Sequence, residues 1–149
     1  MKCNCNFFKG SGFSSEVFEG VIKNQTEENS INSKVAIKIL KLNNSMEFFK
    51  EAAVAARLSH ENVVKFIGVC LKNNCIIMEL LEGGQLLKFL KGNHRQELTL
   101  WDLVNFSYDL VKGCAYLEDM KFVHRDIAAR NCLLTSTDPL TRKVRILDY

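Results

Sequence analysis

The sequence lacks a strong net charge, a long hydrophobic run and any internal repeat. A formal net charge of +3 over 149 residues indicates neither a basic stripe for nucleic acid nor a polybasic membrane anchor. No apolar run approaches the roughly 20 residues of a membrane-spanning helix. The N-terminus has one lysine followed by polar residues and cysteines, so no signal peptide is expected. With 47% hydrophobic and 25% charged residues, the composition is that of an ordinary soluble globular domain.

The six cysteines are an even number, which is compatible with disulfides. Cys3 and Cys5 form a Cys-x-Cys pair, but no second pair follows that would complete a zinc tetrahedron. The other four lie inside apolar segments, where a thiol behaves as a small hydrophobic group: Cys70, Cys75, Cys114 and Cys132. The sequence therefore predicts thiols in a reducing compartment, without a cysteine metal site.

Residues 7–23 predict a strand, a glycine-rich turn and a second strand. Gly10 and Gly12 would let the backbone approach a ligand closely, and N–H groups in such a turn can face a phosphate. Val17 follows at the spacing of the pattern G-x-G-x-x-G-x-V, in which Ser15 replaces the third glycine. For an isolated G-x-G, a plain hairpin is the alternative. Polar residues 24–34 then predict a solvated loop.

Residues 35–40 form a β-branched segment with Lys38 in its middle, matching V-A-I-K. The lysine of that motif grips nucleotide phosphates; the alternative is an edge strand with a solvent-facing lysine. An alanine-rich helix is expected from about residue 46 to 58. Glu51 shares the apolar face of this helix with Phe48, so it should point toward the core and pair with Lys38.

The later elements are expected in a fixed order: a buried strand over residues 63–71, a turn at 72–74, a strand at 75–79, a hinge at 79–84, a short helix at 85–91, a long helix from Thr99 to about residue 118, and strands at 132–134 and 144–147. Asp102 lies three residues after Thr99, as in a variant of the capping box. Apolar residues recur along the long helix at helical spacing: Leu103, Phe106, Leu110, Cys114 and Leu117.

Residues 124–131 match H-R-D-x-x-x-x-N, with Asp126 and Asn131 five positions apart. Together with the preceding motifs in their order and the terminal Ile-Leu-Asp-Tyr, this segment makes the chain resemble the protein kinase catalytic domain over essentially its whole length. Ala128, Ala129 and Arg130 are similar to the tyrosine kinase form, because serine/threonine kinases usually carry lysine where Ala128 stands. Several segments are most similar to receptor tyrosine kinases of the anaplastic lymphoma kinase and insulin receptor group: residues 63–71, 79–90 and 131–135.

The resemblance implies an α+β, protein-kinase-like fold. Residues 1–78 would form a β-rich N-lobe with one helix. Residues 79–149 would form the hinge and the first part of a mainly helical C-lobe, through the catalytic loop to a metal-binding aspartate. The implied reaction is transfer of the γ-phosphate of ATP to tyrosine hydroxyls of protein substrates.

The resemblance also assigns roles to single residues. Asp126 would accept the proton of the substrate hydroxyl, Lys38 would hold the α- and β-phosphates, Glu51 would orient Lys38, and Arg130 would support the electrostatics on the substrate side. Mg²⁺, with Mn²⁺ as an alternative, would be held by Asn131 and Asp148. ATP would contact a larger set: Gly10, Gly12, Val17, Ala36, Lys38, Met78, Glu79, Leu81 and Leu133.

The sequence departs from the kinase pattern in two ways that bear on activity. Tyr149 stands where the D-F-G motif has phenylalanine, and neither the glycine of that motif, the activation loop nor the A-P-E segment follows. We therefore expect a C-terminally truncated kinase domain, complete for nucleotide contacts, that alone would transfer little or no phosphate. A parent receptor would place it on the cytoplasmic side of the plasma membrane; otherwise the location would be cytoplasmic.

Three other interpretations compete with a tyrosine kinase. A non-catalytic pseudokinase or an ATP-binding interaction fragment is favoured by Ser15, Ala55, Tyr149 and the truncation, whereas retention of the catalytic residues argues against it. Ala128 and Arg130 oppose a serine/threonine kinase. A P-loop NTPase has little support, because G-x-x-x-x-G-K-[ST] does not occur.

Overall fold

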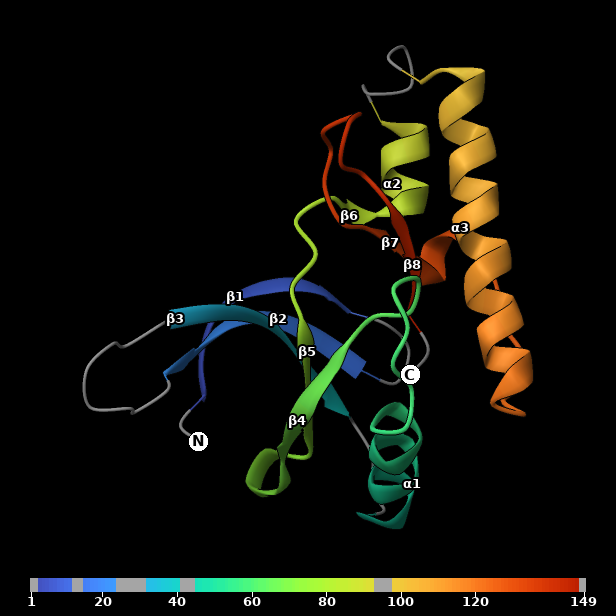
Figure 1. The fold of residues 1–149 in the computed structure, drawn as a ribbon. Coiled ribbons are helices and arrows are strands. Elements are labelled where there is room, and N and C mark those ends of the chain that lie inside the picture. Colours follow the sequence, from blue (N-terminus) through green and yellow to red (C-terminus); the bar gives the residue numbers. More distant parts are fainter. Residues whose placement is uncertain (1–2, 12–14, 24–31, 41–44, 93–97, 148–149) are drawn as a thin grey trace. The chain divides into compact units, whose positions relative to one another are not determined.

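The computed structural model describes residues 3–11, 15–23, 32–40, 45–92 and 98–147 (Figure 1). The chain divides into two compact units. The first unit comprises Met1–Arg57 and Phe66–Leu80, and the second comprises Leu58–Lys65 and Leu81–Tyr149. Residues 58–65 therefore group with the second unit, although they lie between two parts of the first unit in the sequence.

The first unit is built on a five-stranded antiparallel sheet with the order β1-β2-β3-β5-β4. The strand bounds are β1 Cys3–Ser11, β2 Ser15–Lys23, β3 Asn32–Leu40, β4 Phe66–Cys70 and β5 Cys75–Glu79. The pairing of β2 with β3 is continuous from Ser15 opposite Leu40 to Lys23 opposite Asn32. These strands are rich in β-branched and aromatic residues, which fit a pleated, half-buried surface. The two expected strands and the V-A-I-K strand are confirmed, with β1 and β3 each beginning a few residues earlier. The expected turn at 12–14 and residues 24–31 of the expected loop lie outside the described residues.

One face of this sheet carries a compact apolar core. Its buried members are Ile22, Val35, Ile37, Cys75 and Ile77. Successive side chains of a strand point to opposite faces, so the neighbours Ala36 and Lys38 project from the other face of β3. The alternation of apolar core residues with Lys38 thus explains why a lysine can lie mid-strand without entering the core.

Helix α1 spans Ser45–Ala55 and is shorter than expected. Its last turn tightens, since the N–H of Arg57 bonds to the carbonyl of Val54 three residues back at 3.0 Å. Phe48 and Ala55 are buried as expected. The extension to residue 58 is wrong: Leu58 is buried, but it belongs to the second unit rather than to the stripe of α1.

The prediction of a buried strand over residues 63–71 is also wrong. Strand β4 covers only Phe66–Cys70 and is an edge strand, with Ile67 and Val69 exposed. Val63 and Val64 are buried, but they lie in the second unit. One apolar run therefore serves two units, and a run of this kind cannot reveal its boundary by periodicity. The expected turn is present as the 3₁₀ turn Leu71–Asn73, closed by Asn74 in the left-handed conformation.

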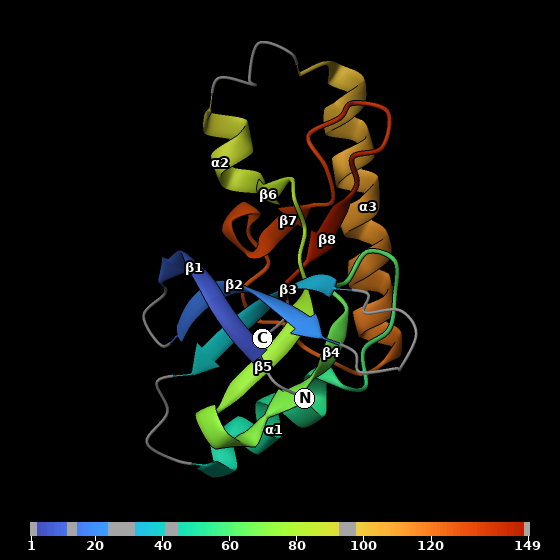
Figure 2. The ribbon, with the colours of Figure 1, turned by 90° about the vertical axis from the view of Figure 1, so that its left-hand side faces the viewer.

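The second unit combines two helices with a small antiparallel sheet of order β6-β7-β8, with which both helices share one core (Figure 2). The bounds are β6 Gly84–Gln85, α2 Leu86–Lys91, α3 Leu100–Asp119, the 3₁₀ turn η3 Ala129–Asn131, β7 Cys132–Leu134 and β8 Val144–Ile146. The helices and the last two strands match their expected positions closely. Strand β6 was not expected, because one glycine followed by one glutamine carries no strand pattern.

The start of α3 confirms the predicted capping box. Thr99 accepts the N–H of Asp102 at 3.2 Å through its hydroxyl, and the Asp102 carboxylate accepts the N–H of Thr99 at 2.8 Å. The predicted apolar stripe is only partly right, since Leu103 is exposed. The buried face instead consists of Asp102, Phe106, Asp109, Gly113 and Leu117. Two carboxylates on this face hold the loop before β8, through an ion pair of Asp102 with Arg142 and a bond from the Val144 N–H to Asp109.

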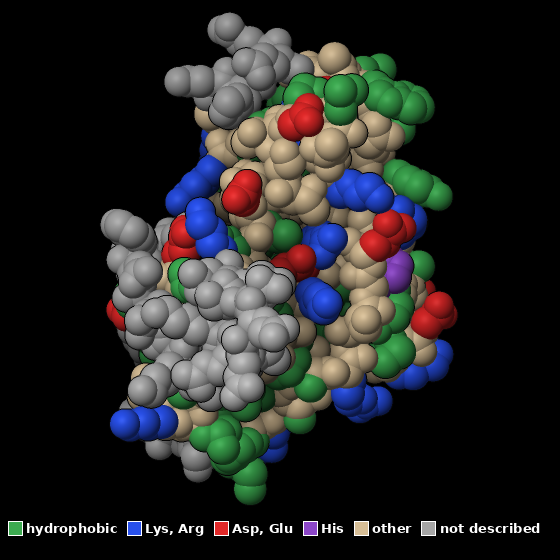
Figure 3. Space-filling view, turned by 60° about the vertical axis from the view of Figure 1, so that its left-hand side comes forward, with side chains coloured by type: hydrophobic (Ala, Val, Ile, Leu, Met, Phe, Trp, Pro, Cys, Tyr) green, Lys and Arg blue, Asp and Glu red, His purple; other side chains and the backbone are tan. Residues whose placement is uncertain are grey.

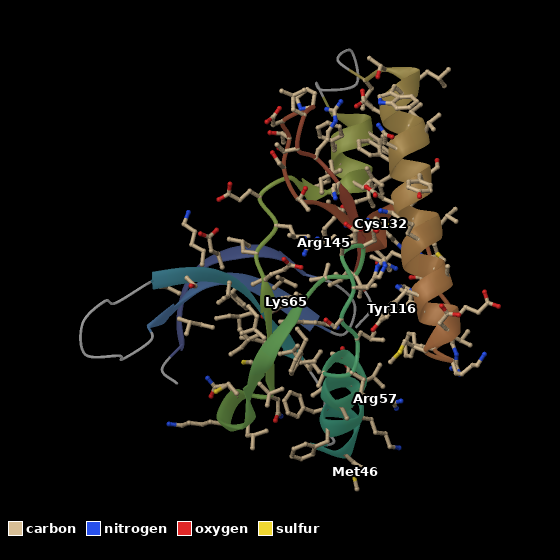
Figure 4. The ribbon with its side chains drawn as sticks, viewed as in Figure 1. Met46, Arg57, Lys65, Tyr116, Cys132 and Arg145 are labelled. Atoms are coloured by element: carbon tan, nitrogen blue, oxygen red, sulfur yellow. The ribbon has the colours of Figure 1, made fainter. Side chains whose placement is uncertain are left out.

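Residues 58–65 are fastened to α3 and β8 inside the second unit. Val64 donates to the Ile146 carbonyl at 2.9 Å, and Ile146 donates to the Asn62 carbonyl at 2.8 Å. Glu61 pairs with Lys112 of α3 and with Lys143, which lower the pKa of its carboxyl to about 2. Tyr116, labelled on α3 in Figure 4, accepts the N–H of Ser59 and stacks on His60.

The outer face of α3 exposes large apolar side chains. They are Leu100, Trp101, Leu103, Val104, Tyr108 and Val111. Even so, none of the described helices combines the length and the apolar character needed to cross a bilayer. The four cysteines in the described apolar segments are present as thiols, as predicted.

Candidate functional site

The two charged residues predicted to pair in the first unit do so. Lys38 Nζ lies 2.5 Å from Glu51 Oε1, and the side chains are 10% and 27% exposed. A lysine this buried needs an anion, because desolvation of an unpaired ammonium is costly. The buried Phe48 and Ala55 fix the rotation of α1, so that Glu51 is presented to Lys38.

Strand register places four further candidate nucleotide contacts of the first unit on the face that carries Lys38, whereas Glu79, opposite Val35, lies at the other face. Residues directly opposite each other in antiparallel strands share a face. Gly10 lies opposite Val17, and Val17 lies opposite Lys38. Ala36, two residues before Lys38 on β3, lies opposite Met78 of β5, and both residues are buried. This face therefore carries five of the predicted ATP contacts, whereas Gly12 lies outside the described residues.

In the second unit, the H-R-D segment forms a turn with its acidic group held open to solvent. Arg130 Nη2 lies 2.5 Å from Asp126 Oδ1, and the side chains are 58% and 53% exposed. Asn131 Nδ2 donates to Asp126 Oδ2 at 2.7 Å and to the Asp126 carbonyl at 2.9 Å. These three residues lie in one turn because the Asn131 N–H donates to the Ala128 carbonyl, and this bond closes η3 shortly after Asp126. The turn thus presents an oriented carboxylate beside a cation.

The His124 ring stabilises this turn through hydrogen bonds to the backbone. Its Nδ1 accepts the N–H of Asp126 at 3.2 Å, so the ring proton is on Nε2, which donates to the Leu147 carbonyl at 3.0 Å. Leu147 in turn donates to the Asn131 carbonyl at 2.8 Å. Arg125 has a φ of +67°, a conformation that a non-glycine residue adopts only when its surroundings require it. Through these two bonds His124 connects Asp126 with Leu147, which is a structural role. Asp148, the next residue after Leu147, lies outside the described residues.

The hinge segment ends in two glycines that the backbone requires. Glu79 is the last residue of β5, and the Leu81 carbonyl accepts the N–H of Gly84 at 3.3 Å. Gly84 has a φ of +68°. A Cβ on Gly83 would lie 2.6 Å from the Leu134 carbonyl oxygen. Glycine at both positions therefore allows the chain to turn against β7.

Gln85 is a contact of the H-R-D turn that sequence reasoning missed. Its Nε2 donates to the Arg130 carbonyl at 2.7 Å, and Gln85 pairs with Leu133 in the small sheet. No motif marks this position; only its place directly after the glycine pair is a signal. Gln85 thereby ties β6 to the same turn that holds Asp126.

Cys132 follows the turn directly, at the start of β7, and is buried. Burial and the neighbouring Cys114 raise the pKa of the Cys132 thiol to about 11, so Cys132 is neutral at ordinary pH. Figure 4 labels Cys132 on β7 and Arg145 on β8. On the face drawn in Figure 3, the coloured lysines and arginines are interspersed with aspartates and glutamates rather than gathered into one basic patch.

The donors of the turn fit a hard divalent cation. In the described hydrogen bonds the Asn131 side chain donates through Nδ2, which leaves its amide oxygen available as a metal ligand. Carboxylate and amide oxygens are the groups that Mg²⁺ prefers in proteins. Asn131 can therefore contribute one ligand.

The comparisons with known proteins define the class. The family described as protein tyrosine and serine/threonine kinase matches residues 8–149. The chain belongs to this family, and the expected α+β, protein-kinase-like fold class is confirmed. The family uses ATP and a divalent metal, as expected.

Individual relatives place the chain among tyrosine kinases. It is 41% identical to the tyrosine-protein kinase transforming protein ros of UR2 avian sarcoma virus over 99% of the chain and 40% of that protein. It is 42% identical to the proto-oncogene tyrosine-protein kinase ROS of Homo sapiens over 99% of the chain and 7% of that protein. It is 40% identical to protein sevenless of Drosophila melanogaster over 95% of the chain and 6% of that protein. The resemblance to protein tyrosine kinases is thereby confirmed, and the pseudokinase alternative is not favoured.

Proposed function

We propose that the chain carries the nucleotide and catalytic residues of a protein tyrosine kinase, which transfers the γ-phosphate of ATP to tyrosine hydroxyls. The observation that carries this proposal is the exposed Asp126 carboxylate held between Arg130 and Asn131. Phosphoryl transfer depends on positioning and charge neutralisation more than on covalent chemistry. A carboxylate fixed by two neighbours and open to solvent suits the alignment of a hydroxyl.

Each side chain has a distinct task in this proposal. Asp126 accepts the hydroxyl proton, and Arg130 keeps the carboxylate oriented. Lys38, held by Glu51, contacts the α- and β-phosphates. Mg²⁺, or Mn²⁺ in its place, neutralises phosphate charge when bound. Asn131 and Asp148 supply its protein ligands.

The remaining contacts concern the rest of ATP. Val17, Ala36, Met78 and Leu133 would provide apolar surface for the adenine, and the backbone of Glu79 and Leu81 would meet its polar edge. The backbone at Gly10 and Gly12 would approach the phosphates. Support comes from the shared face of Val17, Ala36 and Met78 with Lys38 in the register of β2, β3 and β5.

We further propose that residues 1–78 and 79–149 act as the N-lobe and partial C-lobe of one receptor-type kinase domain on the cytoplasmic side of the plasma membrane, although residues 58–65 group with the second unit. Its protein partner is a substrate with an accessible tyrosine. The names of the ROS relatives as tyrosine-protein kinases support the choice of tyrosine.

Nucleotide binding is tested by thermal denaturation of the 149-residue chain with increasing Mg·ATP. The melting temperature should rise for wild type and stay unchanged for Lys38→Ala, because a ligand that binds only the folded state stabilises it. Lys34→Ala is the matched control: Lys34 lies on the same strand, and its side chain is 64% exposed. Absence of a rise for soluble wild type, or an equal rise in Lys38→Ala, would contradict the proposal.

Transfer is tested with a Glu/Tyr copolymer as phosphate acceptor. Any transfer by the chain should fall at least about a hundredfold in Asp126→Asn, the usual scale for loss of a general base. Asp119→Asn is the control, since Asp119 is exposed at the end of α3. Transfer that survives the Asp126 substitution would refute the role given to this carboxylate.

A further inference from the structure

The hairpin of β4 and β5 holds two cysteines directly opposite each other. Cys70 ends β4, Cys75 begins β5, and the two are partners in the antiparallel register. Cα atoms of such partners are about 4.5–5.5 Å apart. Disulfides span Cα distances of about 4.4–6.8 Å, so the backbone already has the required separation.

The two thiols also lie on the same face of the sheet. Cys75 is a buried member of the core of the first unit, and Cys70 packs against that core. Ile39 lies opposite Cys75 on the other side, so Ile39, Cys75 and Cys70 form one row across β3, β5 and β4. Because partners in a row share a face, the two Cβ atoms point in the same direction.

The backbone of the hairpin needs no rearrangement, but the Cys75 thiol donates to the Asn73 carbonyl at 3.2 Å and has to turn from that acceptor toward Cys70. The 3₁₀ turn Leu71–Asn73 and Asn74 in the left-handed conformation already return the chain. Cys75 is 3% exposed, whereas Cys70 is only partly buried. A reagent therefore reaches the Cys70 thiol first. The Cys75 thiol can then displace the part of the reagent that has become bound to the Cys70 sulfur.

We propose that Cys70 and Cys75 are a thiol pair that forms a cross-strand disulfide when a small disulfide such as oxidised glutathione is present. The Cys70 thiolate attacks one glutathione sulfur, which forms a mixed disulfide and releases one glutathione thiolate. The Cys75 thiolate then attacks the Cys70 sulfur, which releases the second. Two electrons pass from the cysteine sulfurs to glutathione disulfide, and the two cysteine protons end on the two released thiols.

The test uses the whole chain in glutathione redox buffers, followed by acid quench, alkylation and trypsin. Trypsin cuts after Lys72, between the two cysteines, so the link joins peptides 66–72 and 73–88. We expect these two linked peptides from the folded chain. The equilibrium constant for formation of the disulfide should be at least about tenfold larger in the folded chain than in urea, where the strand register is lost. An equal constant in urea, or other cysteine pairs in its place, would overturn the proposal.

Two variants make the result specific. Cys75→Ser should accumulate the mixed glutathione disulfide at Cys70, because the second attack is blocked, whereas wild type should not. Cys132→Ser should leave the 70–75 link unchanged, because the buried Cys132 thiol lies in the second unit. Equal accumulation of the mixed disulfide in wild type and Cys75→Ser would overturn the proposal.

Discussion

The pair of Asp102 and Arg142 gives a stability prediction that can be worked out from its contacts. Arg142 Nε donates to Asp102 Oδ1 at 3.1 Å, and the side chains of Arg142 and Asp102 are 2% and 11% exposed. The guanidinium lies 5.5 Å from the ring centroid of Phe89 and 5.7 Å from that of Phe106. Its Nη1 has no hydrogen-bond partner among the described residues. Removing the Asp102 carboxylate therefore leaves a cation buried among aromatic rings.

We expect Asp102→Ala to lower the free energy of unfolding by about 3–5 kcal/mol, the usual cost of leaving one member of a buried pair uncompensated. The variant also loses the acceptor for the Thr99 N–H at 2.8 Å and hydroxyl at 2.7 Å. Alanine returns less than about 0.7 kcal/mol through its better helix propensity. The unpaired charge therefore decides the outcome.

Urea unfolding followed by far-UV circular dichroism would measure this loss. Thr99→Ala is the matched control, because it removes the hydroxyl cap, keeps the ion pair and should cost about 1 kcal/mol. Combining Asp102→Ala with Arg142→Met removes both charges and should recover much of the stability. The reasoning fails if Asp102→Ala costs no more than Thr99→Ala, or if the double variant is no more stable than Asp102→Ala.

The same pair predicts a pH dependence. Hydrogen bonds from Arg142, and then from Thr99, lower the pKa of Asp102 from 3.8 to about 2. Because the folded pKa lies below the unfolded one, the stabilisation is complete above about pH 4 and is lost as the pH falls through about 2. The stability advantage of wild type over Asp102→Asn should therefore shrink within this window.

Four further predictions concern other contacts. Glu51→Gln should weaken the Mg·ATP-dependent rise in melting temperature, because Lys38 loses its anion; an unchanged rise would argue against an orienting role. Gly113→Ala should lower the free energy of unfolding in urea by up to about 2 kcal/mol, because the new Cβ would lie 2.7 Å from Ile146 Cδ1. Overpacking costs about 1–3 kcal/mol, which outweighs the gain of about 1 kcal/mol from the better helix propensity of alanine. Glu61→Gln should lower the melting temperature at low salt and not at about 1 M salt, where exposed pairs are screened. Cys132 should be alkylated by iodoacetamide at neutral pH far more slowly in the folded chain than in urea, by mass spectrometry, because its pKa is raised to about 11.

Local patterns with their own chemistry were predictable from the sequence. The pairing of Lys38 with Glu51 follows from a motif on a strand and from helical spacing, and the structure has it. The capping box at Thr99 and Asp102 is likewise local, since both partners lie in one turn. The backbone period determines the capping pair, whereas Lys38 and Glu51 lie thirteen residues apart on β3 and α1 and were paired only because a motif and a helix face marked them.

Contacts between distant segments were not predictable in this way. The partner of Asp102 is Arg142, forty residues later in a loop without periodicity. Gln85 reaches the Arg130 carbonyl across a similar separation. The extent of β4 was wrong because a continuous apolar run does not show where one unit ends and another begins. In each case the missing information is which segments the topology brings together.

The grouping of residues 58–65 with the second unit has a consequence for dissecting the chain. The polypeptide passes from one unit to the other after Arg57, Lys65 and Leu80, so neither unit is a continuous piece of sequence. A fragment ending near residue 80 would carry Val63 and Val64 without the β8 backbone that pairs with them. A fragment beginning near residue 81 would leave β8 and Gly113 without the Asn62 backbone. Cutting at the apparent boundary should therefore yield two incomplete pieces, and linking residues 58–65 to the later fragment is the rational way to isolate the second unit.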